Sequence, residues 1–282
     1  MFLEYKDGAR LDLSRPRVMG ILNVTPDSFA DGGRYNRIDS ALRRAEEMAA
    51  EGADIIDVGG ESTRPGAQPV SDNEELERVI PVIEKLAASV DVPLSVDTCK
   101  PAVMAAAVGA GAAMINDINA LRAQGALQTA SGLGVPVCLM HMRGEPRTMQ
   151  QAPAYADVVA EIKAFLEERI NECTRAGIPR RSLLVDPGFG FGKTLQHNVE
   201  LMKSLSVYKE LNLPLVVGFS RKSMLGSLLG GGRPVPVEQR LYGSLAAAAW
   251  AILQGAQIMR VHDVAATVDV IRVLAAVTPS AN

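Results

Sequence analysis

The chain of 282 residues is poor in aromatic side chains and has almost no excess charge. Phe, Tyr and Trp make up 4% of it, which leaves few platforms for stacking the bases of single-stranded nucleic acid. Lys and Arg number 29 and Asp and Glu number 32, so the formal net charge is -3. Nonspecific binders of nucleic acid or of anionic membranes are usually basic. The composition therefore argues against both kinds of partner.

Cysteine is also scarce: the chain contains only Cys99, Cys138 and Cys173. An odd number of distant cysteines, with no C-x-x-C pair, argues against a disulfide framework or a zinc site and is typical of a cytoplasmic protein. Cys99 and Cys138 have no neighbouring base, so we expect small buried apolar side chains rather than nucleophiles. No signal peptide is evident. Two uncharged stretches, 123–142 and 241–259, contain Gln, Gly or Pro, so neither is expected to span a membrane.

Short apolar runs recur along the chain and alternate with segments of helical periodicity. Runs that are apolar nearly throughout favour parallel strands buried on both faces. Eight runs of this kind occur, at 17–24, 53–60, 92–98, 112–118, 135–142, 183–188, 213–220 and 256–263. Helices are predicted at 39–51, 71–88, 157–176, 198–211 and 238–254, the second with a capping box from Ser71 and Glu74. Gly52, Gly111 and Gly255 each open a repeated helix-to-strand joint, where a left-handed glycine ends the helix.

Eight strands that alternate with helices predict a (β/α)8 barrel, with residues 1–282 forming a single domain. The first fifteen residues are expected to form a short hairpin or arm that closes the bottom of the barrel. A doubly wound sheet is the competing architecture. It usually has fewer strands and a glycine-rich first turn. The first turn here reads Asn-Val-Thr-Pro-Asp over residues 23–27, which disfavours that alternative.

Polar residues follow the predicted strands, at the end of a barrel where active sites form. They are Asn23, Asp57, Asp97, Asn116, Asp117, His141, Asp186, Lys222, Arg260 and His262. Carboxylate and amide oxygens of Asp97, Asn116 and Asp186 suit a flat ring that has several N–H donors. Cationic donors from Arg64, Lys222, Arg260 and His262 suit a phosphate or a carboxylate. The alternative is a set of internal Asp–Arg and Asp–Lys pairs. No role is assigned to His141.

Three further features suggest how an anion and a ring are held. The turn at 218–223 leads from a strand into a helix, whose first N–H groups bind anions. Asn23 offers an oxygen ligand for Mg²⁺ next to a diphosphate. The glycine-rich segment 188–193 lacks the G-K-[ST] spacing of a P-loop. We expect its glycines to let the backbone approach a flat ligand beside Asp186, with Phe191 packed on the edge of that ligand.

Seven segments, in this order, resemble the dihydropteroate synthase family over nearly the whole chain. They lie at 20–29, 59–66, 95–98, 115–118, 186–193, 220–223 and 260–263. The resemblance implies a (β/α)8 barrel, usually homodimeric, and an Mg²⁺-assisted condensation of a dihydropterin-methyl diphosphate with 4-aminobenzoate. The implied mechanism is dissociative: diphosphate leaves first, and the arylamine then attacks a pterin cation. Both substrates are small molecules. Sulfonamides mimic 4-aminobenzoate and are therefore expected inhibitors. The apolar helix at 241–253, together with the C-terminal segment, is a candidate dimer interface, and packing on the barrel explains such a helix equally well.

The resemblance also implies roles for individual residues. The pterin ring would lie against Asp97, Asn116, Asp186 and Lys222. The diphosphate would be held by Asn23 with Mg²⁺, together with Thr63, Arg64, Arg260 and His262. Ser223, Phe29 and Pro65 would contact 4-aminobenzoate. Asp97, Asp186, Lys222, Arg64 and Arg260 are the residues expected to carry catalysis.

Three positions depart from the usual family pattern: Ala30, Cys99 and Asn119. None is among the expected ligand positions, so the activity should be kept. Two alternatives share the barrel. A pterin-binding methyltransferase does not need the diphosphate residues or the loops around Arg64 and Ser223. A non-catalytic pterin-binding paralogue should have lost Asn23, Arg64 or Lys222. All of these residues are present.

Overall fold

The computed structural model describes residues 1–25, 34–63, 66–231 and 233–278, and in residues 34–37 the backbone only. Within these residues, eight parallel strands form one sheet in the order β8-β7-β6-β5-β4-β3-β10-β9. The strands are β3 (Arg17–Asn23), β4 (Ile55–Gly59), β5 (Leu94–Asp97), β6 (Met114–Asp117), β7 (Val137–Met140), β8 (Leu183–Asp186), β9 (Val216–Val217) and β10 (Ile258–Val261). A parallel bridge between Val185 and Leu215 joins β8 to β9 and closes the ring. The predicted barrel and all eight strand positions are confirmed.

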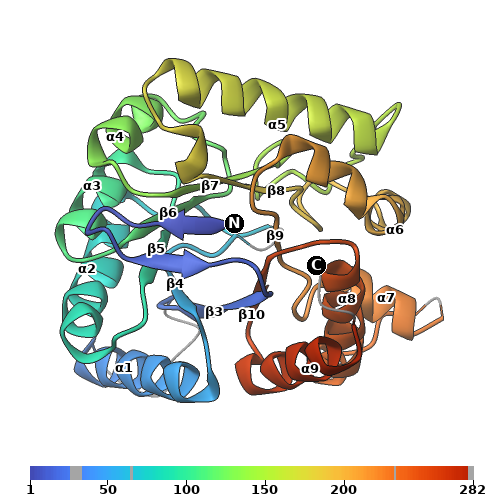
Figure 1. The fold of residues 1–282 in the computed structure, drawn as a ribbon, viewed down its shortest axis with the longest axis horizontal. Coiled ribbons are helices and arrows are strands. Elements are labelled where there is room, and N and C mark those ends of the chain that lie inside the picture. The colour runs from blue at the N-terminus through green and yellow to red at the C-terminus, as the bar shows by residue number, and fades with distance from the viewer. Residues whose placement is uncertain (26–33, 64–65, 232, 279–282) are drawn as a thin grey trace.

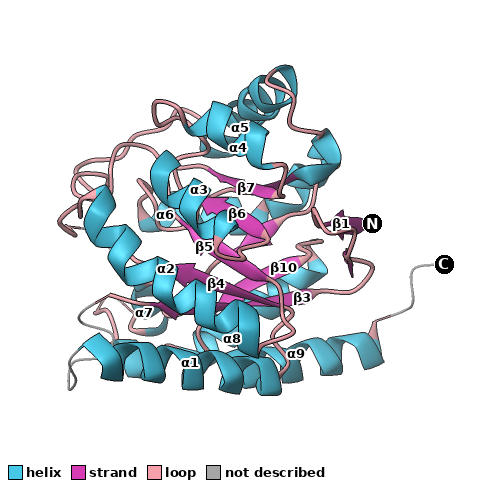
Figure 2. Ribbon diagram, turned by 90° about the vertical axis from the view of Figure 1, so that its left-hand side faces the viewer, coloured by secondary structure: helices cyan, strands magenta, loops and turns pink. Residues whose placement is uncertain are grey.

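Helices surround the strands on the outside of the ring (Figures 1 and 2). They are α1 (Arg34–Glu51), α2 (Asp72–Ser89), α3 (Pro101–Gly109), α4 (Ala126–Leu133), α5 (Val158–Arg175), α6 (Leu195–Lys203), α7 (Ser223–Leu229), α8 (Leu241–Leu253) and α9 (Val264–Val277). The helix predicted at 198–211 is two elements, α6 and a 3-10 segment at Leu205–Leu211. The one predicted at 238–254 likewise begins with a separate 3-10 turn at Val237–Gln239. No described helix is long and apolar enough to cross a membrane.

Local signals explain where several of these elements begin and end. Gly52, Gly111 and Gly255 have φ values of +99°, +117° and +99°, so the predicted left-handed joints are confirmed. Ser71 caps α2 by accepting a hydrogen bond from the Glu74 N–H at 3.2 Å. The Glu74 carboxylate pairs with Arg78 instead of completing the predicted box.

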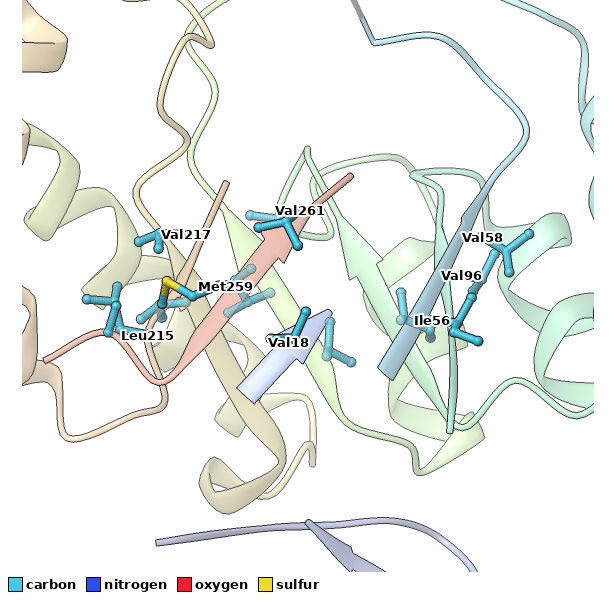
Figure 3. Packing of buried hydrophobic residues seen from close by; sticks show 14 of the residues in the cluster. Val18, Ile56, Val58, Val96, Leu215, Val217, Met259 and Val261 are labelled. Atoms are coloured by element: carbon cyan, nitrogen blue, oxygen red, sulfur yellow. The ribbon is translucent and has the colours of Figure 1, made fainter. Parts of the chain in front are cut away.

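The strands bury apolar side chains on both faces. Outward-facing residues pack against the helices; Figure 3 labels Ile56, Val58 and Val96 among them. Inward-facing residues form a second cluster at the amino ends of the strands. An antiparallel hairpin, β1 (Phe2–Glu4) with β2 (Arg10–Asp12), lies over that end (Figure 1). Its Leu3, Tyr5 and Leu13 belong to the inner cluster, so the predicted N-terminal hairpin seals the bottom of the barrel.

Candidate active site

The barrel interior has a lower layer of apolar residues and an upper layer that carries polar ones. The polar residues of the upper layer lie two positions after apolar residues of the lower layer on the same strands. Side chains of a strand alternate between its faces, so positions i and i+2 both point inward. The pairs are Ile55 and Asp57, Met114 and Asn116, Leu184 and Asp186, and Ile258 and Arg260. Strand register also sets Asn23, Gly59, Asp97 and Asn116 side by side across β3, β4, β5 and β6. The predicted mouth therefore brings polar side chains of several strands together at one end of the barrel.

Arg260 lies at the centre of this layer, between two carboxylates. Its Nε donates to Asp57 Oδ2 at 2.6 Å, and its Nη2 donates to Asp97 Oδ2 at 2.6 Å. The same Asp57 oxygen accepts a hydrogen bond from Asn116 Nδ2 at 3.0 Å. The alternative considered from the sequence was that polar residues at the mouth form internal Asp–Arg pairs. Arg260 does form such pairs. A pair of this kind also fixes the orientation of both carboxylates.

Asp57 organises two side chains of this layer, Arg260 and Asn116. The sequence placed Asp57 on a strand but indicated no role for it. Its side chain is fully buried, and it holds the Nδ2 side of the Asn116 amide. The amide oxygen of Asn116 therefore faces away from Asp57 and is free to accept from a ligand. The signal that would have found it is its position: Asp57 lies two residues before the strand end, in phase with the inward-facing set.

Burial changes the charge balance of the layer. It raises the pKa of Asp97 to about 7, a rise that the Arg260 guanidinium opposes and the Asp57 carboxylate reinforces. Burial by itself would lower the pKa of Arg260, but the Asp57 and Asp97 charges raise that pKa above its ordinary value. The guanidinium therefore stays charged, whereas Asp97 titrates near neutral pH.

Asp186 and Lys222 form the opposite side of the mouth. Asp186 Oδ1 accepts from the Gly188 N–H at 2.7 Å, and burial raises its pKa while Lys222 opposes that rise. Burial lowers the pKa of Lys222 to about 8, against the influence of Asp186. The Lys222 ammonium donates to the Phe189 carbonyl and lies 4.6 Å from the centroid of the Phe191 ring. That distance is within the range of a cation–π contact.

Two glycines of segment 188–192 are required by close contacts within the protein. A Cβ on Gly188 would lie 1.9 Å from the His141 carbonyl oxygen, and one on Gly192 would lie 2.3 Å from that of Arg143. Gly188 and Gly192 therefore make room for the backbone of residues 141–143, and the predicted approach of this segment to a ligand stays a prediction. Phe191 is 9% exposed and packs in a small cluster with Ile118, Met140, Met142 and Met149.

The predicted anion-binding residues are less fully described. Arg64, Pro65, Phe29 and Ala30 lie outside the described residues. Thr63 is half-buried, and Ser223 is exposed at the first position of α7. His262 Nδ1 lies 3.0 Å from Ser220 Oγ, which also accepts from the His262 N–H.

Two N–H groups of the turn at 218–223 donate within the protein. The Arg221 N–H donates to Ser244 Oγ at 3.0 Å, and the Lys222 N–H donates to the Phe219 carbonyl at 3.0 Å. Helix α7 has seven residues, so its dipole is short. The anion site expected at the start of this helix stays a prediction.

Asn23 meets the requirements for one ligand of Mg²⁺. Gly59 separates Asn23 from Asp97: a Cβ on Gly59 would lie 3.8 Å from Asn23 Oδ1 and 3.6 Å from Asp97 Oδ2. The missing side chain leaves both oxygens facing the same small space. The described residues contain no group of three or more His, Cys, Asp or Glu side chains around a possible ion. Mg²⁺ commonly takes one or two protein oxygens and fills its shell with phosphate and water, so this donor set fits it.

Two of the atypical positions lie beside the layer rather than in it. Burial raises the pKa of the Cys99 thiol to about 12, which agrees with an unreactive side chain. Asp117 accepts from the N–H groups of Asn119 and Leu121, each at 2.7 Å. Asp117 is thus a structural residue that holds a turn in which Ala120 and Leu121 have positive φ.

Comparisons with known proteins agree with this site. The model of the pterin binding enzyme family matches residues 19–262. Dihydropteroate synthase of Escherichia coli K12 is 55% identical over 272 residues, which cover 96% of this chain and 95% of that protein. A Yersinia pestis dihydropteroate synthase structure with a sulfonamide drug has a TM-score of 0.92 at 54% identity, covering 98% of each chain. A Xanthomonas albilineans dihydropteroate synthase in complex with 7,8-dihydropteroate has a TM-score of 0.88 at 50% identity, covering 99% of this chain and 100% of that one.

Proposed function

The chain belongs to the dihydropteroate synthase family of pterin-binding enzymes, and from that premise we propose how its own residues carry out the reaction. It is a transferase of folate biosynthesis. It condenses (7,8-dihydropterin-6-yl)methyl diphosphate with 4-aminobenzoate to give 7,8-dihydropteroate and pyrophosphate. One observation carries the assignment of roles: the carboxylates of Asp97 and Asp186 and an oriented amide face the same mouth as the half-buried Lys222.

The pterin ring binds against Asp97, Asn116 and Asp186, which accept hydrogen bonds from its N–H edge. The Lys222 ammonium donates to a ring acceptor, and Phe191 packs at the ring's edge. The C–O bond to diphosphate then breaks, and the resulting charge spreads over the dihydropterin. Asp97 and Asp186 stabilise that cation because they are fixed in place before the reaction. The arylamine of 4-aminobenzoate attacks the exocyclic carbon; a neutral arylamine needs no strong general base.

The leaving diphosphate is held by Thr63, Arg64, Arg260 and His262. Arg260 has five N–H donors, more than the two that reach Asp57 and Asp97 in the described part of the chain, so it can also contact a phosphate oxygen. Asn23 would hold Mg²⁺ through its amide oxygen. That ion would supply charge neutralisation on the diphosphate oxygens as they leave. Ser223, Phe29 and Pro65 contact 4-aminobenzoate.

The test is to follow pyrophosphate release and dihydropteroate formation together, with both substrates and Mg²⁺. We expect both products only when the pterin diphosphate and 4-aminobenzoate are present. Adding EDTA should abolish turnover, and a sulfonamide should compete with 4-aminobenzoate. A folded sample that binds pterin but forms no dihydropteroate would contradict the assignment and favour a non-catalytic paralogue. Methyl transfer from methyltetrahydrofolate would favour the methyltransferase.

We also propose that the enzyme is a homodimer that associates through α8 and α9. An apolar groove between these helices is lined by Leu245, Ala249, Ala266, Asp269, Val270, Val273 and Leu274. Tyr242 and Leu253 are 80% and 54% exposed on α8, which is a large apolar exposure for a monomer. Sedimentation should give twice the 30.0 kDa chain mass. Val273→Asp should shift the protein to monomer, whereas Asp91→Asn on another face should not.

Two further assignments remain proposals. A single domain of residues 1–282 is supported by the hairpin, which packs into the inner core of the barrel. A cytoplasmic location is supported by the free thiols of Cys99, Cys138 and Cys173. One cooperative unfolding transition tests the first proposal. Fractionation of cells that express the tagged full chain tests the second.

A further inference from the structure

The loop between β8 and α6 has an unusual backbone environment. Each of its five consecutive carbonyls, from Gly188 to Gly192, accepts a hydrogen bond from a side chain. Lys193 Nζ donates to Gly188 and Phe191, Lys222 Nζ to Phe189, Gln150 Nε2 to Gly190 at 2.5 Å, and Tyr155 Oη to Gly192 at 2.9 Å. Loop carbonyls usually face water. This loop is instead tethered along its length, which restricts it to one conformation.

Lys193 makes the largest contribution to this tethering. Its residue is 3% exposed, and its Nζ lies 2.8 Å from the Gly188 carbonyl, 3.0 Å from that of Phe191 and 3.0 Å from His141 Nδ1. The His141 carbonyl lies 3.5 Å from the same atom, so four polar atoms surround this amine, whose pKa is lowered by burial. The side chain points into the loop rather than toward the mouth, so it does not compete for a ligand.

His141 completes the arrangement as an acceptor. Burial, with a smaller contribution from Lys193, lowers the pKa of His141 to about 2, so its imidazole stays neutral. A neutral ring that accepts at Nδ1 carries its proton on Nε2. Its ring also lies edge-on to Phe165, with centroids 4.9 Å apart. The acceptor that faces Lys193 is therefore held in place by packing.

The backbone of loop 188–192 forms hydrogen bonds with two residues of the mouth. The Gly188 N–H donates to Asp186 Oδ1 at 2.7 Å, and the Phe189 carbonyl accepts from Lys222. Lys193 holds the carbonyls of Gly188 and Phe191, which lie on either side of Phe189. Losing both bonds would free the segment that orients the Asp186 carboxylate and the Lys222 ammonium.

We propose that Lys193 is a positioning residue for pterin binding: it holds loop 188–192 in the shape that orients Asp186 and Lys222. This inference rests on the proposed function, because it concerns the pterin pocket of that reaction. It predicts that losing Lys193 weakens pterin binding specifically, whereas a residue that only stabilised the fold would reduce the amount of active protein and leave the remaining affinity unchanged.

The experiment compares Lys193→Met with wild type and with Lys85→Met, a substitution of an exposed lysine on α2. Binding of 6-hydroxymethylpterin is measured by calorimetry, at a temperature where circular dichroism shows all three proteins folded. The Kd of Lys193→Met should rise about 100-fold, in line with the effect of misplacing binding groups by roughly 1 Å. In turnover assays, KM for the pterin substrate should rise, while KM for 4-aminobenzoate should stay within about twofold of the wild-type value.

Two milder variants test the loop even where Lys193→Met does not fold. Gln150→Leu with Tyr155→Phe removes two outer tethers and leaves Lys193 in place, and should raise the pterin Kd about threefold. Lys193→Gln keeps amide donors and should fall between Lys193→Met and wild type. An unchanged pterin Kd in folded Lys193→Met, or in Lys193→Gln where the former is unfolded, overturns the proposal. Wild type that binds pterin but does not turn over would defeat the proposed reaction, while the Kd comparison would still decide the role of Lys193.

Discussion

The lower and upper layers of the barrel interior are made by the same strands, yet they differ completely in chemistry. Ile55, Met114, Leu184 and Ile258 fill the bottom, and the residues two positions later form a charged network at the mouth. Burying charge is costly unless each group is paired, and in the mouth Arg260 joins two carboxylates. In this fold, the residues that fill the core of the barrel and those that line its mouth are therefore only two positions apart on the same strand. Among the described residues, Ser95 Oγ and the Tyr5 hydroxyl in the lower layer and Asp57 Oδ1 in the upper layer are buried without a hydrogen-bond partner.

Removing Arg260 should give the largest effect, because it breaks the upper layer. Arg260→Met leaves Asp57 and Asp97 buried without their cation, so the free energy of unfolding should fall by about 3–5 kcal/mol. Dihydropteroate formation should be lost as well. Urea unfolding and product chromatography measure the two effects. Arg43→Met, at an exposed position on α1, is the control and should change neither. Unaltered stability of Arg260→Met would mean that the carboxylates do not depend on this residue.

Lys222→Met should separate catalytic activity from stability within the upper layer. We expect kcat/KM for the pterin substrate to fall about 10²–10³-fold, as for the loss of one preorganised charge. Stability should not fall, because burial lowers the pKa of Lys222 to about 8 and the protonated form therefore costs the folded state free energy at pH 7. Steady-state kinetics and urea unfolding of the same sample check both expectations. A parallel loss of stability would assign Lys222 a structural role.

The pH dependence of pterin binding tests the charge of Asp97. Since the pKa of Asp97 is about 7 and the ionised form accepts the ring's N–H groups, the Kd should rise about tenfold for each pH unit below that value. Calorimetry between pH 6 and pH 7.5 measures it. Asp97→Asn should bind weakly at every pH in this range. For stability the sign is opposite: between the unfolded pKa of 3.8 and about 7 the folded state binds more protons, so the contribution of Asp97 falls as pH rises.

The smallest effect is expected in the lower layer, at Tyr5. Its hydroxyl is buried without a hydrogen-bond partner among the described residues, and burial raises its pKa. Tyr5→Phe removes that unpaired group and should increase the free energy of unfolding by about 1 kcal/mol. Turnover should be unchanged. Tyr155→Phe is the matched comparison: it deletes a hydroxyl that donates to Gly192, so it should lower stability by a similar amount. If both substitutions changed the free energy of unfolding in the same direction and by the same amount, the presence of a hydrogen-bond partner would not determine the sign of the change.

The sequence by itself determined the scaffold and the position of the mouth. Apolar runs of strand length and glycines at the three joints are local signals, and they depend only on backbone propensity and side-chain periodicity. Eight such runs close a barrel, and residues that follow the strands then share one end. Asp97, Asn116, Asp186 and Lys222 could therefore be predicted to share one end of the barrel without any knowledge of their contacts.

Only the tertiary structure decided how these residues are paired. Arg260 and Asp57 are 203 positions apart, and Lys193 and His141 are 52 apart, so no local pattern indicates that they meet. The sequence showed glycines at 188 and 192 but not the atoms that exclude a side chain there, because these atoms belong to residues 141 and 143. Local propensity specifies where strands form, but a hydrogen-bond partner is specified by closure of the barrel, which brings distant strand ends within contact distance.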